Sequence, residues 1–153
     1  MMPALSAENI RGWRSQLQRV HRWHERLKQP ADDVDRLDTY LAFFINCYAL
    51  RDWFDKSGAV SKATIDRHIS NSECMGICRD LCNRSKHFSI SNPSFDEQFS
   101  LVREYRGETE PNAWIILSCG KKVELYTLAR ECLEFWDRFI AITKPAEPTN
   151  LSI

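Results

Sequence analysis

The sequence is short of glycine, has no long apolar run and carries no excess charge of either sign. Its 153 residues include 5 glycines and no glycine-rich loop of the kind that binds phosphates. The longest apolar run, residues 40–50, is interrupted by Asn46 and is shorter than the about 20 residues that a membrane span needs. Basic and acidic side chains number 21 each. No global field therefore attracts the chain to nucleic acid or to anionic lipid.

The start of the chain and the cysteines predict a location. The first residues hold no basic stretch followed by an apolar block, so the sequence predicts no secretory signal. The 6 cysteines are typical of reduced thiols in a chain without such a signal. We therefore expect a cytoplasmic protein that is not bound to a membrane.

The composition is that of an ordinary globular domain, with 43% hydrophobic and 27% charged residues. At this length one domain is the natural expectation. We expect a single helical domain over residues 1–144. Residues 145–153 contain two prolines and polar residues and are expected to form a flexible C-terminal tail.

Apolar residues recur at steps of three and four in four segments, which predicts four long amphipathic helices. The helices are expected at about residues 7–29, 33–56, 70–88 and 125–142, with a short helical turn at 63–69. The apolar stripe of the second begins at Val34, and that of the last ends at Ile142. Ser70 and Glu73 have the spacing of a capping box and predict the start of the third helix.

Between the third and fourth helices the hydrophobic period changes towards two. This change, at residues 99–105 and 113–119, predicts a β-hairpin. Four long helices with short connections are typical of a bundle. The predicted fold is therefore mainly α, an up-and-down four-helix bundle with a short β-hairpin inserted between helices three and four.

The segment 74–88 carries the residues that are most informative about function. On a helical wheel, the core side holds Cys74, Cys78 and Cys82. The opposite side holds Asp80, Asn83, Arg84 and His87, with Arg79 and Lys86 at its borders. A histidine can exchange protons near neutral pH, and cations bind phosphate. Two interpretations stay open, an ordinary solvated face favoured by the helix dipole and a functional site.

Residues 80–87, together with residues 43–48 and 51–53, resemble the HEPN superfamily (higher eukaryotes and prokaryotes nucleotide-binding domains). Its members are four-helix bundles with an arginine, often followed by asparagine, four to six positions before a histidine on the third helix. Asn83 and His87 match this pattern, whereas Cys82 stands at the arginine position. The resemblance implies a homodimer and, in active members, a metal-independent endoribonuclease of toxin or defence systems, for which an antitoxin-like partner is expected.

In that function His87 exchanges a proton with the ribose 2′-hydroxyl or the leaving 5′-oxygen, and Asn83 positions its neighbours by hydrogen bonds. Asp80 either orients His87 or pairs with Arg84. RNA is required because its 2′-hydroxyl is the nucleophile, and no cofactor is expected. The expected catalytic residues are His87, Asn83, Arg84 and Asp80, and the expected substrate-binding residues are Arg79 and Lys86.

The alternative is a non-catalytic helical module that binds a nucleotide, RNA or a protein through the same face. Cys82 at the arginine position favours this alternative. Asn83, Lys86 and His87 favour the ribonuclease. Arg51 and Asp52, about one turn beyond Tyr48, are placed to approach the third helix.

Other polar and reactive side chains have simpler explanations. Cysteines in three successive helical turns lie too far apart along the axis for one ion, so we expect a packing stripe and no metal site. Asn46 is expected either inside the bundle or pointing at the site, and His24 either hydrogen-bonded in the core or at a dimer surface. The arginines of the first helix form either a solvated face or a strip for the RNA backbone: Arg11, Arg14, Arg19, Arg22 and Arg26.

Overall fold

The fold is mainly helical, with a small antiparallel sheet inserted before the last helix. The computed structural model describes residues 12–86, 100–118 and 120–147. Within these ranges the helices are α2 (Trp13–Arg26), α3 (Asp33–Lys56), α4 (Lys62–Ser70), α5 (Glu73–Lys86) and α6 (Leu125–Thr143). The strands are β1 (Ser100–Glu104), β2 (Ala113–Ser118) and β3 (Lys121–Glu124). None of the described helices is both long and apolar enough to cross a membrane.

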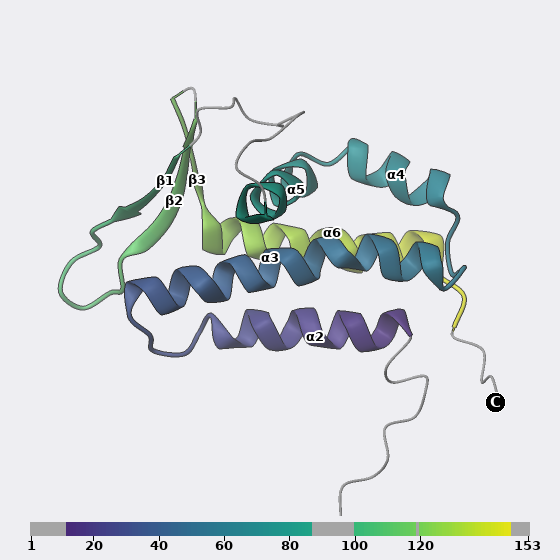
Figure 1. Cartoon of the computed structure of the whole chain (residues 1–153), viewed down its shortest axis with the longest axis horizontal. Coiled ribbons are helices and arrows are strands. Elements are labelled where there is room, and N and C mark those ends of the chain that lie inside the picture. Colours follow the sequence, from purple (N-terminus) through teal and green to yellow (C-terminus); the bar gives the residue numbers. More distant parts are fainter. Residues whose placement is uncertain (1–11, 87–99, 119, 148–153) are drawn as a thin grey trace, which may run out of the picture.

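The helices are not all aligned. Figure 1 shows α2, α3 and α6 along the long axis of the molecule, whereas α5 is seen nearly end-on. Helix α3 packs against both α2 and α6, and α5 packs against α3, α4 and α6. The mainly helical prediction is confirmed. The up-and-down arrangement is not confirmed, because α5 lies across the helices that it contacts.

Local capping sets where the central helices begin. Asp32 caps α3, since its carboxylate accepts a hydrogen bond from the Asp35 amide at 2.8 Å. The predicted capping box is wrong. Ser70 is the last residue of α4, and its hydroxyl donates to the Arg67 carbonyl at 3.1 Å. Ser72 instead accepts from the Met75 amide at 3.3 Å at the start of α5.

The core lies between α3, α5 and α6 and is rich in aromatic rings. Phe54 contacts both Trp136 and Phe139, with ring centroids 5.4 and 5.2 Å apart. Val34 and Ile142 were predicted on the apolar stripes but are 65% and 66% exposed. They lie in the end turns of their helices, where the neighbouring helices no longer cover them.

Asn46 is satisfied inside the protein, which was one of its two predicted positions. Its amide nitrogen donates to the Ala42 carbonyl at 2.8 Å, and its amide oxygen accepts from Gln16 at 3.3 Å. Gln16 is itself buried and also donates to the Asn46 carbonyl at 2.8 Å. The pair links α2 to α3 through polar groups within an apolar interface.

The predicted hairpin is present, as β1 paired antiparallel with β2, and a third strand extends it. Strand β3 was not predicted because its four residues include one apolar side chain, Val123. The sheet is tied to the start of α3 through Asp33. The Trp114 indole donates to the Asp33 carbonyl at 3.0 Å, and Arg103 and Asn112 each donate to its carboxylate at 3.1 Å.

The first residues of the predicted tail contact the helices. The Ala146 amide donates to the Ala59 carbonyl at 3.1 Å, and the Ala146 carbonyl accepts from the Trp13 indole at 3.0 Å. Glu147 pairs with Arg14 at the start of α2. These contacts fix residues 145–147 against the helices, while residues 148–153 lie outside the described part of the chain.

Candidate functional site

Helix α5 carries the predicted site, but part of the predicted polar side is buried. Asp80 is 2% exposed and accepts hydrogen bonds from Arg79 at 3.3 and 3.4 Å. Its expected place on the outer side is therefore wrong. Because α5 packs against α3, α4 and α6, its solvent-facing arc is narrower than the helical wheel predicts. Asn83 is half-buried and Arg84 is exposed.

Two predicted residues cannot be placed. His87, the expected proton-transfer residue, lies outside the described residues, and so does the side chain of Lys86. The structure therefore brings Arg79 and Asp80 together and leaves the relation of Asn83 to His87 a prediction.

The residue at the motif's arginine position points into the protein. Cys82 is 3% exposed, and its thiol donates to the Phe44 carbonyl on α3 at 3.1 Å. Cys78, one turn earlier, is also buried, and its thiol lies 3.5 Å from the same carbonyl. Position 82 thus belongs to the contact between α3 and α5, not to an exposed surface.

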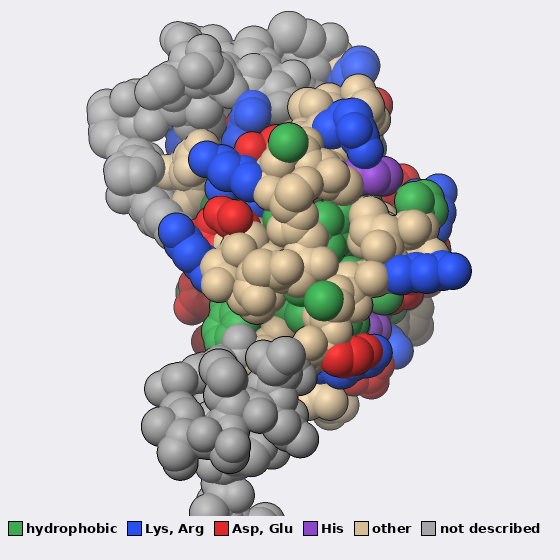
Figure 2. All heavy atoms as spheres, turned by 90° about the vertical axis from the view of Figure 1, so that its right-hand side faces the viewer, with side chains coloured by type: hydrophobic (Ala, Val, Ile, Leu, Met, Phe, Trp, Pro, Cys, Tyr) green, Lys and Arg blue, Asp and Glu red, His purple; other side chains and the backbone are tan. Residues whose placement is uncertain are grey.

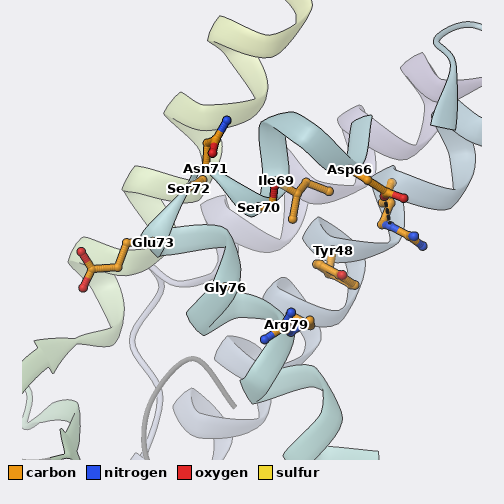
Figure 3. Close-up of a pocket in the computed structure, with 10 residues that line it drawn as sticks. Tyr48, Asp66, Ile69, Ser70, Asn71, Ser72, Glu73, Gly76 and Arg79 are labelled. Atoms are coloured by element: carbon orange, nitrogen blue, oxygen red, sulfur yellow. Dashed lines mark hydrogen bonds and ion pairs between the residues drawn. The ribbon is translucent and has the colours of Figure 1, made fainter. Parts of the chain in front are cut away.

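A cleft of about 620 Å³ opens between α3, α4 and α5, and we name it the α4–α5 cleft. Arg79 connects it to the predicted site. In Figure 3 Tyr48 and Arg79 lie next to each other, from α3 and α5 respectively. The residues that line the cleft are Tyr48, Arg51, Asp66, Ile69, Ser70, Asn71, Ser72, Glu73, Gly76 and Arg79.

Carboxylates hold the arginines of this cleft in place. Arg51 donates to Asp66 on α4 at 2.9 Å, and this hydrogen bond raises the pKa of Arg51. Arg79 is held by Asp80, yet 37% of its side chain remains exposed. Glu73 points away from Arg79 (Figure 3) and pairs with Lys121 of β3 at 3.7 Å.

Tyr48 gives the cleft an aromatic wall. The side chain is half-buried, and burial raises the pKa of its phenol, although the nearby Arg51 and Arg79 act in the opposite direction. The phenol therefore stays protonated at neutral pH and can donate a hydrogen bond. With two guanidinium groups and the polar turn 70–72, the cleft can bind a small anionic ligand that also carries a ring.

The charge on one face of the molecule is mixed. Figure 2 shows the face at the right-hand side of Figure 1, where basic and acidic side chains are interspersed. On α2, Arg14 pairs with Glu147, Arg19 contacts Gln16, and Arg26 lies over the Trp23 ring at 4.3 Å. These three arginines have protein partners, which is typical of a solvated face, whereas Arg11 lies outside the described residues.

His24 lies against aromatic rings. Its ring is 5.8 Å from Phe43 and 5.7 Å from Tyr126. Its buried Nε2 has no hydrogen-bond partner among the described residues. Burial, and secondarily Lys28, lowers the pKa of the imidazole, so His24 is neutral at pH 7.

On the opposite side of α5 from the cleft, three buried sulfurs converge. Cys47 of α3, Cys78 of α5 and Cys132 of α6 place their Sγ atoms within 4.8 Å of one another, and we name these residues the thiol cluster. Burial opposes ionisation of all three thiols and raises the pKa of Cys78. The prediction from α5 alone missed the cluster, because two of its sulfurs come from other helices.

Cys74 lies beside this cluster near the surface. Its Sγ is 3.2 Å from the Ser72 hydroxyl, and the Cys132 thiol lies 3.6 Å from the Cys74 carbonyl. Hydrogen bonding with the Cys132 thiol, and then with Ser72, lowers the pKa of Cys74 to about 7 although burial opposes it.

Comparisons with models of protein families, with curated proteins and with solved structures gave no match. What the protein does must therefore be argued from its own side chains.

Proposed function

We propose that this protein binds a nucleotide in the α4–α5 cleft and is a HEPN-like helical binding module. The observation that carries this proposal is the position of Arg79. It is the one predicted substrate-binding residue whose side chain the structure describes, and it lines the cleft with part of its side chain exposed. The cleft volume of about 620 Å³ falls within the range typical of small-ligand sites.

The phosphate of the ligand is assigned to Arg79, with Arg51, which also lines the cleft, as a second cation. A guanidinium binds phosphate through two parallel hydrogen bonds. Asp80 and Asp66 hold these two side chains in position, so little rotamer entropy is lost when a ligand binds.

The remainder of the nucleotide is assigned to the uncharged parts of the cleft. The Tyr48 ring offers a surface for stacking of a base, which is worth about 1–3 kcal/mol in nucleic-acid complexes. Ser70, Asn71 and Ser72 offer hydroxyl and amide groups to a ribose or a base edge.

A small ligand is favoured over a long RNA strand by charge. A polyanion is held mainly by counterion release, which needs several unpaired cations along its path. Here each cleft arginine has a carboxylate partner, and the net charge of the chain is zero. A ligand with one phosphate and one ring matches these paired charges better than a strand of RNA does.

The test is calorimetric titration of the purified chain with AMP and with adenosine. We expect AMP to bind at least about tenfold more tightly, because loss of a charged hydrogen bond costs about 1.5–3 kcal/mol. Arg79→Gln should lose this preference, while Arg67→Gln should keep it, since Arg67 is exposed on α4 and does not line the cleft.

Three results would overturn the assignment. They are no binding of AMP at millimolar concentration, equal affinity for AMP and adenosine, and an unchanged preference in an Arg79→Gln protein that is folded by circular dichroism.

A second candidate is the metal-independent endoribonuclease that the HEPN resemblance implies. What favours it is the accessibility of Asn83 and Arg84 at the end of α5 that leads to His87. In this function His87 transfers the proton and Arg84 or Arg79 holds the scissile phosphate, within a homodimer controlled by an antitoxin-like partner. Cys82 and Asp80 weigh against it, because both are buried.

This candidate is tested by incubating the protein with mixed RNA in excess chelator, beside His87→Ala and Asn83→Ala proteins. Cleavage that is lost in both variants would establish the ribonuclease. Absence of cleavage at high protein concentration, or equal cleavage by His87→Ala, would reject it and leave the binding module.

A further inference from the structure

The thiol cluster has the geometry of a metal site. In a site with Zn–S bonds of about 2.3 Å, the sulfurs are about 3.8–4.0 Å apart. The three Sγ atoms of Cys47, Cys78 and Cys132 already lie within 4.8 Å of one another. A contraction of less than about 1 Å per pair, which rotation of the side chains can provide, brings all three to bonding distance of one ion.

The origin of the sulfurs makes the convergence informative. Each comes from a different helix, α3, α5 and α6, so no helical repeat forces them together. Small residues that only fill space need not place their polarisable atoms at one point. Here all three do so, and all three are completely buried.

The donor atoms determine which ion fits. A set of sulfur ligands selects soft or borderline ions such as Zn²⁺ and Cu⁺, whereas Mg²⁺ and Ca²⁺ require oxygen ligands. No carboxylate or imidazole belongs to this group of described residues. We propose that Cys47, Cys78 and Cys132 bind one thiophilic d¹⁰ ion, Zn²⁺ or Cu⁺, and that this ion joins α3, α5 and α6.

Binding exchanges protons for the ion. Each sulfur that binds as thiolate releases its proton to solvent. The Cys78 and Cys132 thiols now lie 3.5 Å from the Phe44 carbonyl and 3.6 Å from the Cys74 carbonyl, and these contacts are given up. Cys74, half-buried beside the cluster, offers a further sulfur nearer the surface.

The experiment uses the full chain, reduced and freed of metal. It is titrated without oxygen with Zn²⁺, Cu⁺ or Co²⁺, the last as a spectroscopic probe of sulfur ligation. We expect one ion per chain by mass spectrometry, a thiolate-to-cobalt charge-transfer band, and a thermal midpoint raised by about 5 °C or more. Competition between Zn²⁺ and Cu⁺ then distinguishes the two ions.

Variants separate the cluster from other cysteines. Cys132→Ala should lose the ion and the cobalt band. Cys82→Ala is the matched control, because Cys82 is equally buried on α5 but does not belong to the cluster. Full occupancy in Cys132→Ala, or no ion bound to the folded wild-type chain at equimolar metal, would overturn the proposal. If Cys132→Ala fails to fold, the cobalt spectrum of the wild-type chain decides alone.

Discussion

Cys78 and Arg79 are consecutive residues of α5, yet they lie in opposite environments. Cys78 is completely buried in the thiol cluster, whereas Arg79 lines the α4–α5 cleft and is partly exposed. Both residues lie on α5, and the helices packed around α5 determine which side chain is buried and which is exposed to solvent. α3 and α6 supply the other sulfurs, while α3 and α4 supply the other walls of the cleft.

This contrast predicts that substitutions in the two environments affect the stability of the protein differently. Groups in the buried region around the thiol cluster are desolvated, so a change of charge or volume there acts on the free energy of unfolding. Groups in the cleft keep water on one side, and changes there act mainly on ligand affinity, except where they leave a buried partner behind, as a change of Arg79 does with Asp80. We therefore expect Cys82→Arg to destabilise the protein by at least about 1 kcal/mol more than Arg51→Gln does.

The largest expected effect is that of Cys82→Arg, which places an arginine where the HEPN pattern has one. Because position 82 is buried against α3, the new guanidinium would lose its hydration without a designed partner. We expect a loss of about 3–5 kcal/mol of unfolding free energy, measured by denaturant titration. Asn83→Arg, one residue on and only half-buried, should change it by less than about 1 kcal/mol.

A Cys82→Arg protein as stable as the wild type would show that position 82 can face solvent. The buried side of α5 would then not include position 82. A gain of RNA cleavage in that variant would favour the ribonuclease over the binding module.

A smaller difference is expected between the two cleft arginines. Arg79→Gln leaves the buried Asp80 with a weaker partner, so we expect a loss of about 1–3 kcal/mol. Arg51→Gln should cost about 0–1 kcal/mol, because the Asp66 side chain is 42% exposed and can be solvated. Urea denaturation of both proteins measures the difference, and equal losses would contradict it.

The smallest effect concerns His24, which lies among aromatic rings and belongs neither to the thiol cluster nor to the lining of the α4–α5 cleft. Its pKa is lower in the folded protein than the about 6.5 of an unfolded chain, so the unfolded chain binds more protons below that pH. Stability should therefore fall as the pH is lowered from about 6.5 towards the folded pKa. In His24→Phe this part of the pH dependence should disappear, a difference of less than about 4 °C in thermal midpoint. Identical profiles from pH 7 to 5 would show that the folded protein does not shift His24.

Much of the fold could be predicted because local signals were strong. The apolar repeat of α3 predicted that helix closely, and the change of period predicted the β1–β2 hairpin. The orientation of α5 could not be predicted in this way. Crossing angles depend on how side chains of two helices fit together, and helical periodicity carries no information about the partner.

The candidate site was predictable only in part, for the same reason. A helical wheel placed Cys78 and Cys82 correctly on the core side of α5. It placed Asp80 wrongly, because a wheel does not show how many neighbours a helix has. The convergence of Cys47 and Cys132 on Cys78 joins residues far apart in sequence, and no spacing within α5 signals it.

The most direct test of the account is to locate the bound nucleotide. In a titration of the ¹⁵N-labelled chain with AMP, followed by amide chemical shifts, we predict that the largest changes fall on Tyr48, Asn71, Ser72 and Arg79. Adenosine should perturb Arg79 much less than AMP does. Changes concentrated on the arginines of α2 or on Asn83 and Arg84, with the cleft amides unmoved, would contradict the assignment of the cleft as the binding site.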